Sequence, residues 1–495
     1  MSKPTAIVIG AGVAGLASAI RLAVKGYAVQ VFEKNSYPGG KLSHFSLVNY
    51  QFDAGPSLFT QPQNIEELFQ LANEPMEAYF TYQSLPISFK YFFEDGTIVN
   101  AYTNQQKLIQ EFKEKLGEDE NAIKAYLQQS EKVYNNIGKL FLNFSLHKTA
   151  TLFKAPILKA IAATKFKHLF RTMNQVNKAS FSNAKTVQLF NRYATYNGSS
   201  PYKAPGMLTL IPHLELNEGT FYPNGGMINI TNALYKLAIK KGVVFNFNTP
   251  VQKIVQQNNI VQGIVVNGEN VPSEIVVSNM DVYFTYKKLL NQEIAAQKIL
   301  KQERSSSALI FYWGIKKEFK ELELHNIFFT NNYEAEFNTL FNTKKLYADP
   351  TVYINITSKC EPGLQAPIGK ENWFVMINVP NNIGQNWEAY KQEAKANIVQ
   401  KLNRILQVNI ETLIEEEAVL DPILIEEKTA SYMGSLYGTS SNSKMAAFLR
   451  HPNFSKSIKG LYFVGGSVHP GGGIPLCLQS AKIISEFVSK PAHSI

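Results

Sequence analysis

The chain has 495 residues, a length that predicts roughly two or three domains with room for a large hydrophobic core. Hydrophobic residues make up 45% and charged residues 18%, which excludes a disordered or collagen-like protein. The two cysteines, Cys360 and Cys477, exclude a disulfide framework and a CxxC metal site, and they are typical of a reduced, intracellular protein. No stretch approaches the ~18 consecutive apolar residues of a membrane span, and MSKPTAIVIGAG at the start contains no signal-peptide core.

The net charge of +10 is unevenly distributed along the chain. Residues 132–214 contain ten Lys, two Arg and no acidic residue, so this stretch holds +12 and the remainder holds −2. A basic region in an otherwise near-neutral chain indicates an anionic surface as partner: nucleic acid, acidic lipid or an acidic protein.

The first 137 residues predict a strand–turn–helix–strand unit followed by helices and a hairpin. TAIVIG is a short apolar run, AGVAGLASAIRLAVKG has helical periodicity up to Gly26, and YAVQVFEK is rich in β-formers. Residues 64–137 are mainly helical, except for ISFKYFFEDGTIVNAY, where Asp95-Gly96 between two β-rich runs predicts a hairpin.

The remainder of the chain mixes helices and strands. Residues 138–214 are mostly helical, with a loop at NGSSPYKAPG, and a second block contains a helix at INITNALYKLAIKKG and short strands at VVFNF, TPVQKIVQ, GIVVNG and EIVVSN. Residues 300–432 combine strands with a helix near 388–406, and the chain closes with GLYFVGG, a Gly/Pro loop and the helix LCLQSAKIISEFV. The pattern predicts an α/β fold without internal repeats.

The glycines of the first unit predict a dinucleotide site. Gly10, Gly12 and Gly15 form GxGxxG between strand and helix, and Glu33 ends the second strand 18 residues after Gly15. This layout permits a tight turn, close approach of a pyrophosphate and close helix–strand packing, while the helix N-terminus offers free N–H groups to the phosphates. Glu33 would accept hydrogen bonds from a ribose, and its charge disfavours a 2′-phosphate, so NADP is not expected. The competing interpretation is a glycine-rich turn that binds nothing.

A second glycine pair with a cation follows. Gly39, Gly40 and Lys41 could bring backbone and positive charge to the same pyrophosphate, which favours FAD over NAD. The alternative is a surface turn.

Four segments together resemble the bacterial-type carotenoid desaturases, the phytoene desaturase family within the amine-oxidase-like flavoproteins. The resemblance spans the chain and is thinnest over about 104–190 and 320–440, and YATYNGSSPYKAPGMLTLIPHLE at 193–215 is similar to the substrate-domain stretch of that family. The first segment is shared by many flavoproteins, whereas HPGGGIP is the specific one. The four segments are IVIGAGVAGLASAIRLAVKGYAVQVFEKNSYPGGK, FDAGPSLFT, GTFYPNGGM and GLYFVGGSVHPGGGIPLCLQSAK.

The resemblance implies an FAD cofactor, no metal, and contacts at matching positions. Gly55-Pro56-Ser57 would lie near the isoalloxazine, Val251 at the adenine, and the C-terminal loop along the ribityl chain and ring. The sequence departs from the family pattern at two places, which makes individual cofactor contacts there less well supported. Lys41 stands where the family usually has Arg, and Gly465-Gly466-Ser467-Val468 replaces a small-Gly-Thr pattern. The predicted cofactor contacts are Gly10, Gly12, Val13, Ala14, Gly15, Glu33, Lys34, Gly40, Lys41, Gly55, Pro56, Ser57, Val251, Asn279, Gly466, Ser467, Gly473 and Ile474.

The implied architecture is a Rossmann-like FAD-binding domain assembled from three chain segments and interleaved with an α+β substrate-binding domain. The FAD-binding domain would comprise residues 1–63, 219–290 and 440–495. The substrate-binding domain would comprise 64–103, 191–218 and 291–439. Residues 104–190 would form a helical basic region that faces a membrane.

The C-terminal loop suits flavin chemistry. In GGGIP, a proline at the first position of the last helix would start that helix, whose N–H groups could face the negative charge of a reduced flavin. A loop that merely begins the helix is the alternative. His469 is either a base beside the flavin or a structural brace for the loop. The proton acceptor is not identified, and no GxSxG, HExxH or His/Cys cluster is present.

The basic region contains a candidate membrane helix. In PILKAIAATKFKHLFRTMN, which starts at Pro156, one side of a helical projection is apolar and the other carries Lys167, Arg171 and Asn174. Such a helix lies in a membrane interface, attracted to anionic lipid, or packs as an ordinary surface helix on its own domain. No recognition motif accompanies the charge, so nucleic acid is not expected. The predicted location is cytoplasmic, peripheral at the inner face of the cell membrane. The apolar side is formed by Leu158, Ala162, Phe166, Leu169 and Met173.

These observations predict an FAD-dependent carotenoid desaturase that removes two vicinal hydrogens from a membrane-dissolved carotenoid. The favoured step is 3,4-desaturation of a monocyclic, γ-carotene-type substrate, with or without a 1-hydroxyl group. Phytoene desaturation, isomerisation and ketolation share the motifs. A flavin amine or porphyrinogen oxidase and a non-catalytic prenyl-lipid carrier are the alternatives outside the family. The sequence leaves the electron acceptor and the oligomeric state open.

Overall fold

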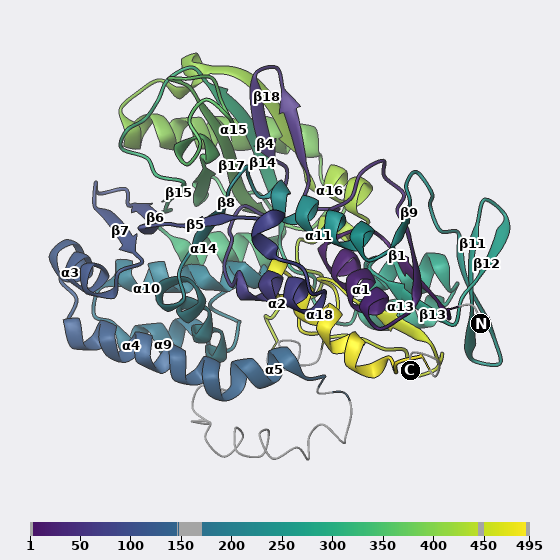
Figure 1. Cartoon of the computed structure of the whole chain (residues 1–495). Coiled ribbons are helices and arrows are strands. Elements are labelled where there is room, and N and C mark those ends of the chain that lie inside the picture. Colours follow the sequence, from purple (N-terminus) through teal and green to yellow (C-terminus); the bar gives the residue numbers. More distant parts are fainter. Residues whose placement is uncertain (1–2, 146, 148–170, 444–449, 492–495) are drawn as a thin grey trace.

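The computed structural model describes residues 3–145, 147, 171–443 and 450–491, and it shows a mixed α/β fold built around two main sheets (Figure 1). The α/β class and the parallel sheet predicted from the sequence are confirmed. Across these residues, every helix is too short or too polar to cross a lipid bilayer.

A five-stranded parallel sheet forms the half of the molecule that contains the N-terminal glycine motif. Its strand order is β19-β13-β1-β2-β9, so neighbouring strands come from three distant stretches of the chain. The strands are β1 (Thr5–Ile9), β2 (Ala28–Phe32), β9 (Val244–Asn246), β13 (Ile275–Ser278) and β19 (Leu461–Phe463).

Alternate residues of β1 enter two different cores. Ala6 and Val8 pack with helices on one face, and Ile7 and Ile9 pack with an antiparallel three-stranded sheet on the other. Both faces of a parallel sheet must be covered, which explains the uninterrupted apolar run in this strand. The helices are α1 (Val13–Val24), α11 (Ile228–Lys240) and α18 (Ile474–Phe487), and the small sheet comprises β10 (Lys253–Gln257), β11 (Ile260–Val266) and β12 (Glu269–Pro272).

A seven-stranded mixed sheet forms the other half, with strand order β18-β14-β17-β16-β15-β6-β7. Phe311 and Trp313 of β14 point into a core beneath helix α15 (Trp387–Leu406), whereas Ile310 and Tyr312 face the interior of the molecule. The strands are β6 (Ile87–Phe92), β7 (Ile98–Tyr102), β14 (Ser307–Ile315), β15 (His325–Phe328), β16 (Val352–Asn355), β17 (Glu371–Val379) and β18 (Ile414–Leu420).

Helices close the lower side of this half (Figure 1). Helix α4 continues through a wide π-type turn, Tyr134–Gly138, into α5, which lies beside α18. Besides α1, α11, α15 and α18, the described α-helices are α2 (Gln63–Leu71), α3 (Gln105–Leu116), α4 (Glu120–Val133), α5 (Lys139–Asn143), α9 (Met173–Ser180), α10 (Ala184–Asn191), α12 (Val282–Phe284), α13 (Glu293–Ile299), α14 (Tyr333–Asn338) and α16 (Pro422–Thr429). The remaining strands are β3 (His44–Leu47), β4 (Tyr50–Asp53), β5 (Tyr82–Ser84) and β8 (Phe221–Pro223).

The Asp95-Gly96 hairpin is confirmed. Strands β6 and β7 pair antiparallel, the Thr97 N–H donates to Asp95 Oδ1 over 3.1 Å, and Gly96 has a φ of +84°. The prediction missed β12 and the β3–β4 pair, whose short runs lack strong β-forming patterns.

Two details of the sequence interpretation are wrong. The predicted helix from Pro156 lies mostly outside the described residues, and it does not extend to Asn174, because Thr172 is extended and caps the separate helix α9. A new helix begins there because the Thr172 side chain accepts a hydrogen bond from the Gln175 N–H in a capping box. Pro475 occupies the second position of α18 rather than the first, because Ile474 already belongs to the helix.

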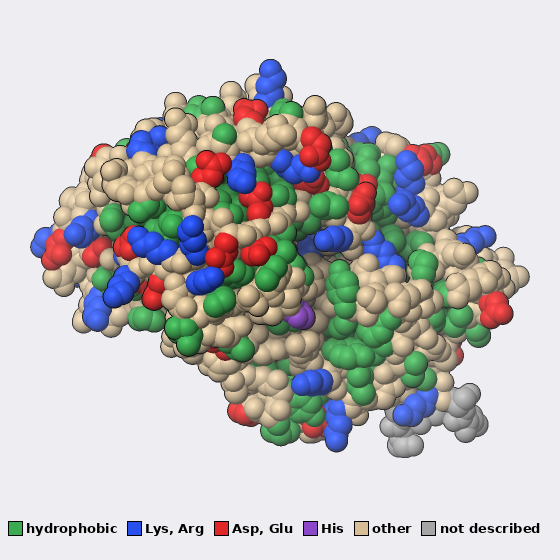
Figure 2. Space-filling model, turned by 90° about the horizontal axis from the view of Figure 1, so that it is seen from above, with side chains coloured by type: hydrophobic (Ala, Val, Ile, Leu, Met, Phe, Trp, Pro, Cys, Tyr) green, Lys and Arg blue, Asp and Glu red, His purple; other side chains and the backbone are tan. Residues whose placement is uncertain are grey.

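Side chains of different kinds separate on the face shown in Figure 2. Basic and acidic side chains alternate over much of its upper part, while hydrophobic side chains gather right of centre. The excess positive charge of residues 132–214 is partly neutralised by ion pairs with the rest of the chain: Lys185 pairs with Asp95 at the surface, and buried Arg192 pairs with Glu215. Five lysines of that stretch, at positions 148, 154, 159, 165 and 167, lie outside the described residues.

Candidate active site

A cavity of about 1140 Å³ lies between the carboxyl ends of the parallel strands and the inner face of the seven-stranded sheet. Every predicted cofactor contact lines this cavity except Gly15. Gly15 has a packing role, since a Cβ there would lie 2.1 Å from the Gly10 carbonyl oxygen.

The first glycine loop has the form that the motif predicts. Gly10 has a φ of +95°, and its N–H donates to the Phe32 carbonyl, which ties the turn to β2. A Cβ on Gly12 would lie 2.6 Å from Asn279 Nδ2, and Gly40 lies directly against the Gly12 Cα. The two glycine pairs therefore form one surface at the N-terminus of α1, and Asn279 at the end of β13 backs it.

Glu33 lies at the cavity wall and is almost fully buried. Its Oε2 accepts from the Ala11 N–H over 2.8 Å, and its Oε1 accepts from the Asn35 N–H over 2.9 Å. The carboxylate thus braces the glycine loop, and each oxygen retains a lone pair for a ribose hydroxyl. Lys34, which follows it, donates its Nζ to the Glu427 carbonyl, and burial lowers the pKa of Lys34.

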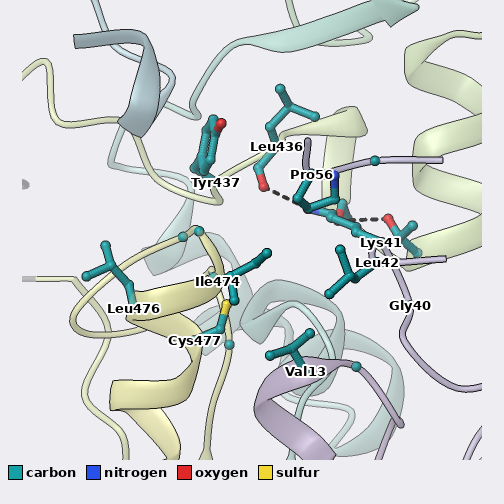
Figure 3. Close-up of a pocket in the computed structure, with 18 of the residues that line it drawn as sticks. Val13, Gly40, Lys41, Leu42, Pro56, Leu436, Tyr437, Ile474, Leu476 and Cys477 are labelled. Atoms are coloured by element: carbon teal, nitrogen blue, oxygen red, sulfur yellow. Dashed lines mark hydrogen bonds between the residues drawn. The ribbon is translucent and has the colours of Figure 1, made fainter. Parts of the chain in front are cut away.

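Lys41 enters the cavity from the second glycine pair (Figure 3). Its Nζ donates to the Leu436 carbonyl over 2.7 Å and to the Ser435 carbonyl over 3.4 Å, and it forms no ion pair with the described residues. Burial lowers the pKa of Lys41 to about 8. An anion in the cavity would compensate this charge.

The C-terminal glycine loop lies opposite α1. Gly465 must be glycine, because it has a φ of +98° and a Cβ there would lie 2.7 Å from Asn279 Oδ1. Ser467 Oγ accepts from the Val282 N–H over 3.0 Å, while Gly473 caps α18 and Ile474 begins it beside the cavity. Val251 lines the same cavity at the edge of the core beneath β1.

Gly55, Pro56 and Ser57 cross from the glycine-rich wall to the apolar half. A Cβ on Gly55 would lie 2.2 Å from the Lys41 carbonyl oxygen, so only glycine allows the two segments to lie side by side. Ser57 Oγ hydrogen-bonds the Tyr353 hydroxyl over 2.8 Å, and that hydroxyl also lies 2.8 Å from His325 Nδ1. Burial and, secondarily, the nearby Arg192 lower the pKa of His325 to about 3, so this imidazole is neutral.

A buried ion pair lies at the far end of the cavity, and the sequence analysis missed it. Arg192 Nη2 contacts Glu215 Oε1 at 3.0 Å, Tyr193 donates to the same oxygen over 2.7 Å, and Tyr196 donates to Oε2. The Arg192 guanidinium also stacks 4.2 Å from the centre of the Phe89 ring. The stretch YATYNGSSPYKAPGMLTLIPHLE contains three of these residues, but only the folded chain joins its two ends.

His469 does not line the cavity. Its ring is fully buried, its Nε2 lies 2.9 Å from the Phe144 carbonyl oxygen, and burial lowers its pKa to about 4. These contacts agree with the interpretation of His469 as a brace rather than a base. The described residues contain no cluster of His, Cys, Asp or Glu that could hold a metal ion.

The residues of this cavity fit a flavin dinucleotide. Gly12, Gly55 and Gly465 leave room where a Cβ would clash, and the N-termini of α1 and α18 both open onto the cavity. Two cations, partly buried Lys41 and buried Arg450, form no ion pair with the described residues, so that an anion could bind beside them. The other half of the cavity is lined mainly by aliphatic and aromatic side chains, among them Leu208, Ile310, Ile327, Phe374 and Met376. The arrangement can hold a dinucleotide next to a long apolar molecule.

Residues 13–486 match the flavin containing amine oxidoreductase family, and the chain belongs to this family. It is an FAD-dependent oxidoreductase, as the glycine motifs predict. The chain is 54% identical over 483 residues to the 1-hydroxycarotenoid 3,4-desaturase of a Flavobacterium species, with 98% of each chain covered. It is also 32% identical to the 4,4'-diaponeurosporene oxygenase of Staphylococcus aureus, covering 98% of this chain and 97% of the relative. These relatives confirm the resemblance to carotenoid desaturases.

The fold itself recurs in solved structures of low sequence identity. An oxidoreductase from Methanosarcina mazei superposes with a TM-score of 0.64 at 16% identity, covering 97% of this chain and 100% of that one.

Proposed function

We propose that this flavoenzyme carries out 3,4-desaturation of a monocyclic, γ-carotene-type carotenoid, with or without a 1-hydroxyl group at its other end. The observation that carries the proposal is the single cavity that joins the glycine-rich flavin wall to an apolar compartment. The 54% identity to a protein with this named activity supports the choice of step.

The chemistry divides between cofactor and protein. FAD, when bound, supplies the two-electron acceptor for the two hydrogens that leave adjacent carbons. The apolar wall orients the polyene and excludes water, and conjugation spreads the positive charge that develops on carbon, so no protein nucleophile is required. Ser57 and the N-terminus of α18 lie where flavin and substrate meet in this proposal.

The predicted cofactor contacts and domain boundaries form part of the same proposal. Residues 1–63, 219–290 and 440–495 would bind FAD, since all strands of the parallel sheet fall within them. Residues 64–103, 191–218 and 291–439 would bind substrate, since they contain the seven-stranded sheet. Residues 104–190 would face the membrane.

Peripheral contact with anionic lipid at the inner face of the cell membrane completes the proposal. The cavity wall includes Phe141 and Leu142 of α5, immediately before the lysine-rich residues 148–170. A membrane-dissolved substrate requires an entrance near lipid. Changing Lys159, Lys165 and Lys167 to Glu should reduce sedimentation with anionic liposomes several-fold, because the lipid attracts each lysine by about 1 kcal/mol.

A matched triple replacement serves as the control for liposome binding. Lys316, Lys317 and Lys320 are exposed lysines in the turn that follows β14, and their change to Glu alters net charge equally. Equal sedimentation of both triple variants would contradict membrane contact through residues 148–170.

The substrate is tested by co-expression in cells that accumulate defined carotenoids. Supply of a monocyclic carotenoid, with or without its 1-hydroxyl, should yield a product two hydrogens lighter that absorbs at longer wavelength, and Gly12→Val should abolish it. Conversion of phytoene alone would assign the earlier desaturation step, and gain of oxygen would assign the oxygenase activity of the second relative. No product, together with a protein that binds no flavin, would support a lipid carrier.

A further inference from the structure

Arg450 is a buried cation in the cavity wall for which the described residues provide no anion. Its side chain is about 1% exposed and lies in the loop before β19. Its Nη1 donates to the Tyr437 carbonyl over 2.7 Å and to the Gly466 carbonyl over 3.4 Å. Its Nη2 has no hydrogen-bond partner within the described chain.

The other buried arginines are all compensated. Each forms an ion pair with a carboxylate, whereas Arg450 forms none with the residues that the structure describes. The three pairs are Arg21–Glu67, Arg192–Glu215 and Arg304–Asp281.

The missing anion matters because Arg450 is charged at neutral pH. Burial, followed by repulsion from Arg304, lowers the pKa of Arg450 to about 10, well above the physiological range. The two carbonyl oxygens accept from only part of the N–H donors of the guanidinium and leave its charge uncompensated. An uncompensated buried charge strongly destabilises the folded protein. The site is therefore complete only when an anionic ligand occupies the cavity.

The surroundings of Arg450 identify which part of the ligand it faces. A Cβ on Gly471 would lie 3.3 Å from Arg450 Nε, and one on Gly472 would lie 2.7 Å from the Tyr437 ring. The glycine loop that begins α18 thus lies directly against these two residues, and Tyr437 and Ile474 share the cavity wall in Figure 3. Helix α1, whose N-terminus would bind phosphate in the proposed function, approaches from the opposite wall, and Lys41 reaches across from the second glycine pair to the Leu436 carbonyl.

We propose that Arg450 faces the flavin ring and stabilises the negative charge that the ring carries when it is reduced. This inference rests on the flavin site of the proposed function. Two electrons and one proton taken up by an oxidised flavin leave one negative charge on the ring, and a preorganised cation in a dry site holds such a charge well. The backbone N–H groups at the start of α18 act together with Arg450.

The midpoint potential of bound FAD tests this role without measuring turnover. Arg450→Met should lower the potential by at least about 30 mV, a tenfold loss in binding of reduced relative to oxidised FAD for a two-electron couple. Arg450→Lys should retain most of the wild-type potential. Arg404→Met, which removes a half-exposed guanidinium remote from the cavity, should leave the potential unchanged.

Four results would overturn the proposal. An unchanged potential with tenfold weaker binding of oxidised FAD would place a phosphate at Arg450, and no change in either quantity would make Arg450 a purely structural residue. If the Arg450 variants do not fold, the test uses the midpoint potential of FAD bound to the wild-type protein. We expect this potential to lie above that of free FAD, and a value at or below that of free FAD overturns the proposal. A negative pigment assay with a shifted potential would reject only the carotenoid substrate, whereas a protein that binds no flavin would reject both.

Discussion

The two ends of the cavity hold their positive charges in opposite ways. At the glycine-rich end, Lys41 and Arg450 donate to backbone carbonyls and form no ion pair with the residues that the structure describes. At the far end, Arg192 is paired with Glu215 and enclosed by tyrosines. The first end is therefore electrostatically incomplete until it binds an anion, and its stability is coupled to the cofactor. The second end is preformed and contributes to stability whether or not ligand is bound.

The largest expected effect comes from breaking the preformed end. Arg192→Met leaves Glu215 buried and unpaired, which should cost about 3–5 kcal/mol in the free energy of unfolding, with FAD saturating or absent. Urea unfolding measures this loss. The control is Arg404→Met, which removes a half-exposed guanidinium and leaves its partner Glu94 beside Lys401 at 3.7 Å, so that the loss should be less than about 1 kcal/mol. Equal losses in the two variants would contradict the contrast between the ends.

Glu33→Leu should produce the next largest effect, this time on cofactor retention. The change strips the Ala11 and Asn35 N–H groups of their acceptor and removes the proposed ribose contact. We expect FAD to bind about 10- to 100-fold more weakly, the equivalent of one or two hydrogen bonds to a charged group. Flavin fluorescence titration measures the affinity. Glu33→Gln keeps an acceptor and should lose less, and wild-type affinity in the Leu variant would refute the assignment.

Lys41 should make the stability of the apoprotein depend on pH. Burial lowers its pKa from 10.5 to about 8, so between these values the unfolded chain holds a proton that the folded chain has released. The free energy of unfolding should therefore rise between about pH 8 and 10.5, by up to about 3 kcal/mol relative to Lys41→Met. Denaturant unfolding of both apoproteins across this range measures the rise. If the free energy of unfolding changes with pH in the same way in both apoproteins, the Lys41 amine is not desolvated.

The smallest effect is expected from Tyr353→Phe at the border between the two ends. The change removes the hydroxyl that joins Ser57 to His325, while Asn355 remains 3.1 Å from His325 Nδ1. A loss of about 1 kcal/mol in stability is expected, as for one net hydrogen bond, with FAD affinity unchanged. A tenfold fall in FAD affinity would instead make Ser57 a cofactor contact that depends on Tyr353.

The contrast between the ends also explains what the sequence could predict. The glycine-rich end is built from short motifs, in which Gly10, Gly12 and Glu33 act within one strand–helix–strand unit whose spacing is set by local geometry. The parallel strands and the Asp95-Gly96 hairpin follow from equally local patterns. The sequence alone therefore predicts where the glycine loop, the parallel strands and the hairpin lie along the chain.

The remaining site residues are joined only by tertiary structure. Arg450 contacts Tyr437 and Gly466 because three loops lie side by side in the folded chain. No sequence pattern within any of these loops predicts the contact. Arg192 and Glu215 lie 23 residues apart on separate helical turns, so neither helical nor strand periodicity pairs them. A hydrophobic pattern predicts which residues are buried, but it does not predict which charged side chains pair with one another in the interior.

The order of strands in the parallel sheet has a consequence for biosynthesis. β1 leaves the ribosome early, but its neighbour β13 ends at Ser278, and the edge strand β19 ends only at Phe463. Strand β2 pairs with one edge of β1 early, but at roughly 5–20 residues per second the other edge stays unpaired on the order of 10–50 s, until β13 is made. The coenzyme pocket cannot be completed during most of translation.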